Sequence, residues 1–184
     1  MQHKSFADMH CPIARSLERV GEWWSMLIVR DALRGARRFD QFQKNLAIAP
    51  NMLTRRLNSL VESGMLERRR YNERPPRYEY VPTERAHDFR PVLWMLLSWG
   101  NRHFAPEGRS VVIVDAQTGV QAEPIVVDRA TGRLLRSPDF ALAAGPAADA
   151  HVRRVYGAAG GSDDPATEGV RVRAKVSKRR SRSH

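Results

Sequence analysis

Apolar residues recur at helical spacing in three stretches at the start of the chain. Ile13, Leu17 and Val20 mark a first helix, which Gly21 ends or interrupts. A second helix follows in EWWSMLIVRDALRG, where Gly35 suits a C-terminal stop. RRFDQFQKNL predicts a short third helix with its apolar side chains on one side. The pattern therefore predicts three consecutive helices before residue 47.

The stretch PNMLTRRLNSLVESG predicts a fourth helix with two different faces. Pro50 fits its first turn, where the missing N–H is not needed, and Gly64 closes it. On a wheel of 3.6 residues per turn, the apolar and polar side chains fall on opposite arcs. The apolar arc holds Leu53, Leu57, Leu60 and Val61; the polar arc holds Asn51, Arg55, Asn58 and Glu62, with Thr54 and Arg56 on the flanks.

The next segment, MLERRRYNERPPRYEYVPT, alternates with a period of two. Two short strands joined by the turn-rich tip NERPP are predicted. A last helix runs through PVLWMLLSWG, and Pro91 predicts a start or a kink there. This order of elements is that of a winged helix–turn–helix, so the predicted fold class is α+β: mostly helical, with a β-hairpin wing.

Arginines occur on the fourth helix and on the hairpin that follows it. Taken singly, they fit a solvated helix face behind a leucine core. Together, a short helix, a turn, an amphipathic helix and a basic hairpin favour DNA binding, because a helix fits the major groove and guanidinium groups suit phosphates and guanine edges. Arg74 and Arg77 at the hairpin tip are placed to reach a phosphate or the minor groove.

As a set, these motifs resemble the HxlR-type winged helix–turn–helix transcriptional regulators over about residues 11–104. The Cys-Pro opening, Gly21 with Trp24, RRFDQF, PNMLTRRLNSL, SGMLERR, PPRYEY and PVLWMLLSWG carry the resemblance. It implies a homodimer that binds a palindromic operator in double-stranded DNA and regulates transcription, with repression expected. The DNA-binding residues that it implies are Pro50, Asn51, Thr54, Arg55 and Arg56, with Arg74, Pro76 and Arg77 in the wing. Arg38 and Asn58 are also predicted to bind DNA.

One position departs from the family pattern. The family often places Ser directly before the proline of the fourth helix, where its hydroxyl can cap the helix or touch a phosphate. This chain has Ala49 there. We expect the missing cap to cost about 1 kcal/mol of helix stability, without changing the family assignment.

The last helix is apolar over a wider face than a domain of about 95 residues can bury together with the first helix. The simpler explanation of this apolar face is that it packs inside the chain. The resemblance favours an interface between two copies related by a two-fold axis. The fourth helices of the two copies would then meet DNA half-sites about one turn of the DNA helix apart. The predicted dimerisation residues are Ile13, Leu17, Phe89, Leu93, Leu96 and Leu97.

The charge is unevenly distributed along the chain. The whole sequence has 31 Lys and Arg against 20 Asp and Glu. Residues 1–105 hold 18 basic and 11 acidic side chains, residues 106–170 hold 6 and 9, and residues 171–184 hold 7 and none. A basic domain and a basic tail both suit a polyanion. They also leave open an alternative function, non-specific nucleic-acid binding that depends on the tail.

Cys11 is the only cysteine, which excludes an internal disulfide and a Cys-based zinc cage. If Pro12 begins the first helix, the helix dipole favours the thiolate of Cys11. A thiolate at a dimer interface would respond to oxidants or electrophiles, so a thiol-based sensor acting through Cys11 is a second alternative function. A packed, unreactive thiol is the simpler expectation.

No enzymatic site is expected from the sequence. It has no phosphate-cradling Gly loop, no recognisable acid–base carboxylate pair and no nucleophile elbow, and the six histidines are scattered, so no cofactor or metal is predicted. Its longest apolar runs, MLIV and VLWMLL, are too short to span a bilayer, and the N-terminus does not resemble a signal peptide. We therefore expect a cytoplasmic protein without membrane partners; a small-molecule effector is left open.

Four segments are expected along the chain: an arm at 1–10, the winged helix–turn–helix domain at 11–105, a small β extension at 106–145, and a flexible linker with the basic tail at 146–184. VDAQTG and VDRATG repeat thirteen residues apart between β-branched runs, which predicts a small antiparallel meander. Its net acidity argues against DNA contact. A structural appendage is expected, and a dimer contact or a ligand pocket are alternatives.

Overall fold

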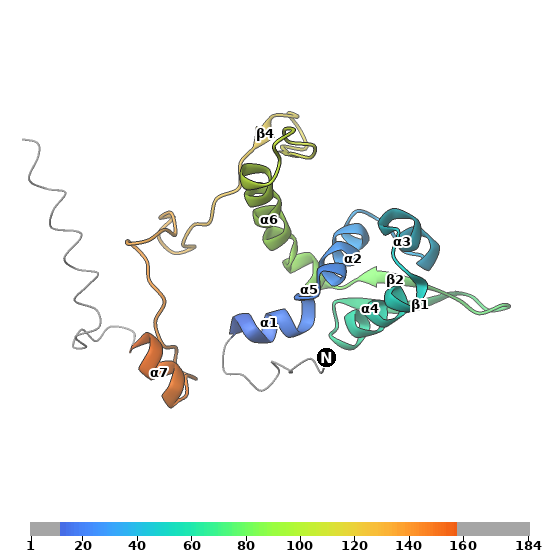
Figure 1. Cartoon of the computed structure of the whole chain (residues 1–184), viewed down its shortest axis with the longest axis horizontal. Helices are drawn as coiled ribbons and strands as arrows, with labels where there is room; N and C mark the ends of the chain where they lie inside the picture. Colours follow the sequence, from blue (N-terminus) through green and yellow to red (C-terminus); the bar gives the residue numbers. More distant parts are fainter. Residues whose placement is uncertain (1–11, 158–184) are drawn as a thin grey trace, which may run out of the picture. The chain divides into compact units, whose positions relative to one another are not determined.

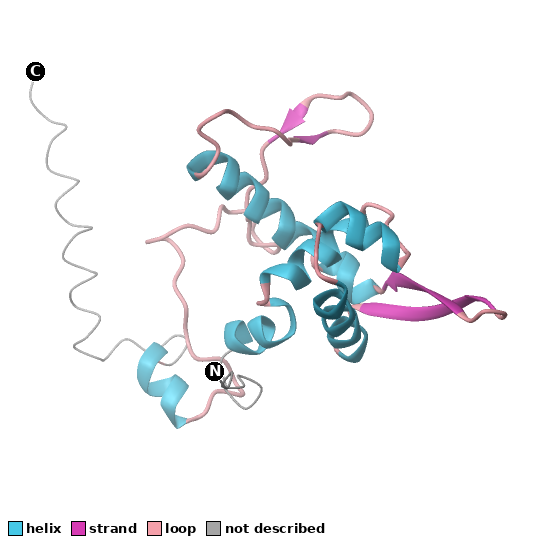
Figure 2. Ribbon diagram, turned by 45° about the vertical axis from the view of Figure 1, so that its right-hand side comes forward, coloured by secondary structure: helices cyan, strands magenta, loops and turns pink. Residues whose placement is uncertain are grey.

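The computed structural model describes residues 12–157 (Figures 1 and 2). The predicted arm, Cys11 and the basic tail lie outside the described residues. The chain divides into two compact units, one ending at Leu135 and the other beginning at Arg136, and each is described by itself. Among the described residues, no helix is both long enough and apolar enough to cross a membrane.

The first unit has the predicted order of elements and confirms the α+β winged helix–turn–helix fold. A body of four helices is followed by the hairpin wing, which projects from it in Figure 2, and then by two further helices. The elements are α1 (Pro12–Val20), α2 (Trp23–Leu33), α3 (Phe39–Leu46), α4 (Pro50–Glu62), β1 (Leu66–Asn72), β2 (Arg77–Pro82), α5 (Glu84–Asp88), α6 (Arg90–His103), β3 (Ile113–Val114) and β4 (Gln121–Ala122).

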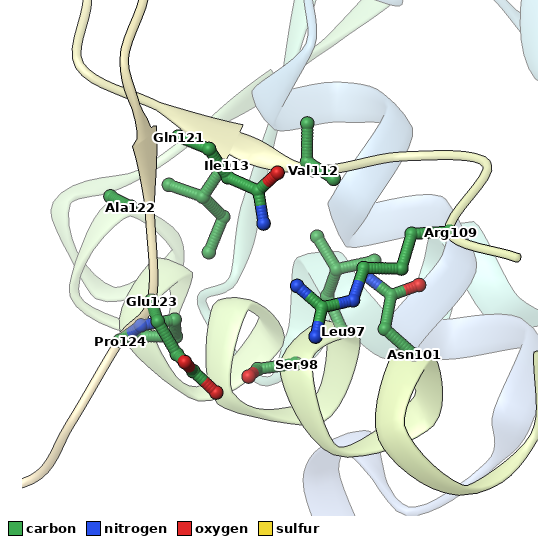
Figure 3. A pocket seen from close by; sticks show the side chains of 10 residues that line it. All are labelled: Leu97, Ser98, Asn101, Arg109, Val112, Ile113, Gln121, Ala122, Glu123 and Pro124. Carbon is green, nitrogen blue, oxygen red and sulfur yellow. The ribbon is translucent and has the colours of Figure 1, made fainter.

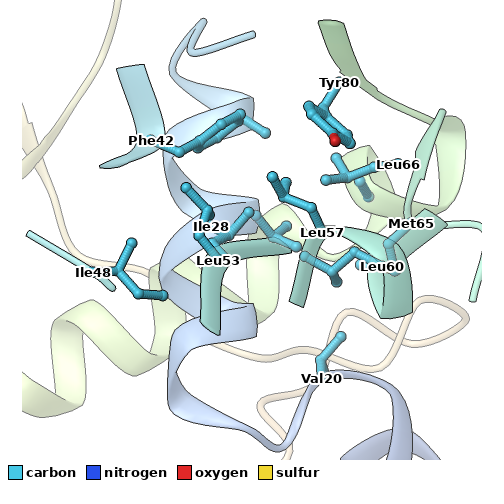
Figure 4. Packing of buried hydrophobic residues seen from close by; sticks show 13 residues of the cluster. Val20, Ile28, Phe42, Ile48, Leu53, Leu57, Leu60, Met65, Leu66 and Tyr80 are labelled. Carbon is cyan, nitrogen blue, oxygen red and sulfur yellow. The ribbon is translucent and has the colours of Figure 1, made fainter. Parts of the chain in front are cut away.

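The core forms where α2, α3 and α4 meet the base of the wing (Figure 4). Ile28 of α2 and Leu57 of α4 are completely buried, as is Phe42 of α3. The rings of Phe42 and Tyr80 meet edge to face, with their centroids 6.5 Å apart, which joins α3 to strand β2. Removing these apolar groups from water is the main force that holds the three helices together.

The wing is an antiparallel hairpin fixed to the helical body at its base. Arg38 forms a β-bridge with Glu79, and the backbone N–H of Tyr80 donates to the carbonyl of Arg37 over 2.7 Å. The segment before α3 therefore acts as a short third strand. The Thr83 hydroxyl donates to the carbonyl of Gly64 over 2.7 Å, which closes the base of the hairpin.

The last helical segment divides near Pro91, as the sequence predicts. Helix α5 ends at Asp88, and α6 begins at Arg90 with Pro91 in its first turn. Proline suits this position because a first-turn N–H has no partner within the helix. Although α6 is rich in apolar side chains, none of its residues is fully buried in the single chain.

The β extension differs from the predicted meander. It consists of two separate hairpins: β3 pairs only with β4, and a single bridge joins Val127 to Leu134. Pro124 lies between the hairpins and has no N–H to donate, which limits the pairing there. The repeated motifs fold alike, because the carboxylates of Asp115 and Asp128 accept bonds from the Thr three residues later, and these bonds hold the pKa of each Asp below its ordinary value.

The second unit contains helix α7 (Ala150–Tyr156), within the segment expected to be a flexible linker. That expectation is wrong for these residues. The Ala-, Gly- and Pro-rich composition suggested a linker, but the segment contains local helix signals. The Asp149 carboxylate caps the helix by accepting from the backbone N–H of Val152 over 2.7 Å, and Gly157 follows the last turn with φ +68°.

We expect Leu57→Ala to lower the free energy of unfolding by about 2–5 kcal/mol, because Leu57 is completely buried on the core side of α4. Asn58→Ala, one residue along the same helix but exposed, should change it by less than about 0.5 kcal/mol. Urea unfolding of both variants measures the difference. Equal effects would contradict the orientation of α4 described above.

Candidate nucleic-acid interface

Helix α4 presents a polar face to solvent on the side opposite its buried leucines. The Arg55 and Asn58 side chains are exposed on this face, as are the predicted contacts earlier in the helix. The Thr54 hydroxyl donates to the carbonyl of Pro50 over 2.9 Å, and no side chain caps the helix at Ala49. The structure thus brings together on one face Pro50, Asn51, Thr54, Arg55 and Asn58.

Arg56 does not share this face. Its guanidinium forms an ion pair with Glu22 at the start of α2, with 2.9 Å between Nη2 and the carboxylate oxygen. The Arg56 side chain is only 16% exposed, against 34% for Glu22. The Arg56 side chain therefore joins the fourth helix to the α1–α2 junction and does not point toward the surface where a DNA contact was predicted.

The wing adds a candidate that the sequence prediction did not include. Arg68 lies on the same face of the hairpin as Leu66, whose side chain is buried among the helices. Its guanidinium carbon sits 3.7 Å from the centre of the Tyr78 ring, a cation–π contact that holds the arginine over the sheet. Alternation with the buried Leu66 was the sequence signal for this placement.

The two following arginines have other partners. Arg69 lies on the opposite face and bonds to Glu67 over 2.7 Å, which holds the pKa of Glu67 below its ordinary value and raises the pKa of Arg69. Arg70 donates to the backbone carbonyl of Glu73 over 2.7 Å and so braces the tip of the wing. The consecutive arginines of the ERRR motif therefore lie in three different environments.

Three other predicted arginines are exposed around the same region. Arg74 and Arg77 lie at the tip and at the start of β2, as predicted. Arg38 directly precedes α3, and its guanidinium carbon is 4.9 Å from the centre of the Tyr71 ring in the wing. The first turn of α3 and the wing therefore meet through an arginine and a tyrosine.

The predicted dimerisation residues divide between surface and core. Ile13, Leu17 and Leu96 are exposed. Phe89 and Leu93 instead pack against the intrachain core, and Leu97 lines a small hollow beside the β3–β4 hairpin. Helix α6 also exposes Val92 and Trp99, which belong to the wide apolar face predicted for this helix, and Trp94, which the prediction did not include.

The fold and the exposed helix define a winged helix–turn–helix protein. The HxlR-like helix-turn-helix family model matches residues 19–108. The chain is 35% identical over 135 residues to Rv3095 of Mycobacterium tuberculosis, an uncharacterized HTH-type transcriptional regulator, covering 73% of this chain and 85% of that one. The protein belongs to the HxlR-like family of transcriptional regulators.

Two solved structures extend the similarity beyond the helix–turn–helix domain. PA1374 of Pseudomonas aeruginosa is 55% identical, with a TM-score of 0.59, and the match covers 79% of this chain and 99% of that one. PA1607 is 35% identical, with a TM-score of 0.68, and the match covers 76% and 99% of the two chains. Each match is longer than the segment 19–108, so the similarity to these two chains continues beyond the helix–turn–helix domain.

We expect Glu22→Gln to lower the free energy of unfolding by about 1 kcal/mol, because it removes the charge that pairs with the largely buried Arg56. Glu62→Gln, an exposed carboxylate on α4, serves as the matched control and should leave stability nearly unchanged. Urea unfolding at neutral pH tests the pair. If both variants match the parent protein, the Glu22–Arg56 pair does not stabilise the fold.

Proposed function

We propose that this regulator is a homodimeric repressor that binds a palindromic operator through α4 and the wing. One observation carries the proposal: α4 buries its leucines and leaves Asn51, Thr54, Arg55 and Asn58 on one exposed face. A helix with this arrangement can enter the major groove without disturbing the core.

Base reading is assigned to the exposed side chains of α4. Arg55 carries a guanidinium fork that matches the two acceptors on the edge of guanine, and Asn58 has the donor and acceptor that match adenine. At the start of α4, Ala49 provides no side-chain cap, Pro50 has no N–H, and the backbone N–H of Met52 donates to the Asn51 side-chain oxygen over 2.8 Å. A phosphate near this end of α4 would therefore be favoured by the helix dipole rather than by a row of free N–H groups.

The basic side chains around α4 are assigned to the DNA backbone. Arg38, Arg68, Arg74 and Arg77 are exposed on the wing and at the start of α3. Contacts of this kind fix the register of the protein on the duplex but carry no base sequence, so they support affinity more than specificity.

Exposed apolar side chains on α1 and α6 support the dimer. Ile13 and Leu17 are exposed on α1, and Val92, Leu96 and Trp99 are exposed on α6. An apolar surface of this kind favours a partner, and a two-fold axis would set two α4 helices against two half-sites. A dimer that covers its operator hinders transcription by occupancy, which is the basis for proposing repression.

Selection from a random duplex pool with the full chain tests base reading. We expect enrichment of a palindrome, which Arg55→Ala should abolish or reduce by about 10-fold or more, since a bidentate contact contributes about 1–3 kcal/mol of discrimination. Arg34→Ala removes the same charge from an exposed position outside α4 and should retain the enrichment.

Salt-sensitive binding without enrichment in the parent protein would contradict the proposal. It would favour the non-specific nucleic-acid protein instead, and truncation after residue 157 would then be expected to abolish binding. Enrichment of an asymmetric site would support base reading by α4 but contradict the proposal that the operator is a palindrome.

The Arg68–Tyr78 contact gives a separate prediction. Tyr78→Leu should weaken operator binding about 2- to 5-fold, because a cation–π contact of about 0.5–1 kcal/mol no longer holds the guanidinium in place. Tyr78→Phe keeps the ring and should bind as the parent does. Fluorescence anisotropy with a labelled operator measures both; equal affinity for the two variants would show that the ring does not position Arg68 for DNA.

A further inference from the structure

The two hairpins of the β extension expose most of their aliphatic side chains. Val120 is 65% exposed and Ile125 is 67% exposed. Isolated two-stranded hairpins are marginal in water, so an extension with so little burial needs another surface. The exposed set is Val111, Val112, Val114, Val120, Ile125, Val126, Val127, Leu134 and Leu135.

The first hairpin is anchored to α6 within the same unit. The Asn101 side chain donates to the carbonyl of Val111 over 2.8 Å, and Arg102 pairs with Glu123 over 2.8 Å. Between these contacts, Leu97 faces the hairpin across a small hollow (Figure 3). The exposed aliphatic side chains are therefore attached to the helix whose other exposed side chains are assigned to the dimer.

The contacts between α6 and the first hairpin place further apolar side chains next to the helix proposed to form the dimer. A protein–protein interface of standard size uses roughly 20–30 residues from each partner. In the described part of α1 and α6, the large apolar side chains that are well exposed are Ile13, Leu17, Val92, Trp94, Leu96 and Trp99. That number includes polar side chains at the rim of an interface, so these six supply only part of its apolar centre. The hairpins, which follow α6 and the exposed Phe104 along the chain, add nine exposed aliphatic side chains.

We propose that the hairpins, residues 111–135, are part of the homodimer interface and are covered by a second copy of this chain. The inference rests on the dimer in the proposed function and extends its interface beyond α1 and α6. DNA does not fit the surface, because residues 111–135 hold three acidic and two basic side chains. A second copy fits it, since the same chain supplies the exposed apolar faces of α1 and α6 that would meet it.

The test introduces charge at the two most exposed hairpin positions named above. Val120→Asp with Ile125→Asp removes little intrachain packing, yet would place two carboxylates in an apolar interface. Arg129→Asp, an exposed residue of the second hairpin loop, changes the net charge by the same −2 and is the matched control. Sedimentation of the full chains over a range of concentrations gives the dimer dissociation constant of each.

We expect the Val120→Asp, Ile125→Asp protein to show a dissociation constant roughly 100-fold or more above that of the parent, with Arg129→Asp unchanged. An unchanged constant for the double variant, or an equal rise in the control, would overturn the inference while leaving the α1–α6 dimer and DNA binding intact. A parent chain that stays monomeric even at 100 times the concentration used in the DNA-binding measurements would instead contradict the dimer itself.

Val120→Ser with Ile125→Ser keeps the test decisive if the aspartates prevent folding, which far-UV circular dichroism would show. Serine is neutral, and both positions are exposed and lie outside the strands, so this pair should fold. Its dissociation constant should rise about 10-fold, because two aliphatic groups are lost from the interface. A value equal to that of the parent would overturn the inference.

Discussion

The packing of the α4 leucines against α2 is the constraint on which the rest of this structure depends. Leu53, Leu57 and Leu60 are all completely buried, so α4 cannot rotate about its axis without exposing them. Because a helix carries its side chains in a fixed angular order, this burial also fixes which residues face outward. The proposed reading face is thus a consequence of the core, and the wing follows it directly, with Met65 and Leu66 continuing the same buried cluster.

The helices could be predicted from the sequence because their signals are local. Apolar spacing, a proline at the start and a glycine near the end act within a few residues, and the observed bounds of α2, α3 and α4 follow those signals. The two hairpin turns at Asp115 and Asp128 also have a local signal, an Asp that accepts bonds from the Thr three residues later. The lack of pairing between the two hairpins was not predictable in this way, since pairing depends on partners farther along the chain and on the break at Pro124.

The roles of individual arginines could not be predicted, because their partners come from other elements. Arg55 and Arg56 are neighbours on one helix, yet Glu22 from the α1–α2 junction engages only Arg56. In the wing, Tyr78 holds Arg68, Glu67 holds Arg69, and the carbonyl of Glu73 holds Arg70. A helical wheel or a strand alternation gives the direction of a side chain, but the neighbour that meets it is a property of the tertiary fold.

The same limit applies to the apolar faces of α6. A helix that is apolar nearly all round gives no periodic signal for which face packs inside the chain. The structure assigns Leu93 to the core and Leu97 to the hairpin, while Leu96 is left on the surface. The spacing between two reading helices would be set by the surface that joins two copies, so a helix contacting both the core and the β extension links the geometry of the dimer to that of the operator. If the extension shares the interface as we propose, it constrains half-site spacing without touching DNA, which gives an acidic segment a role in a DNA-binding protein.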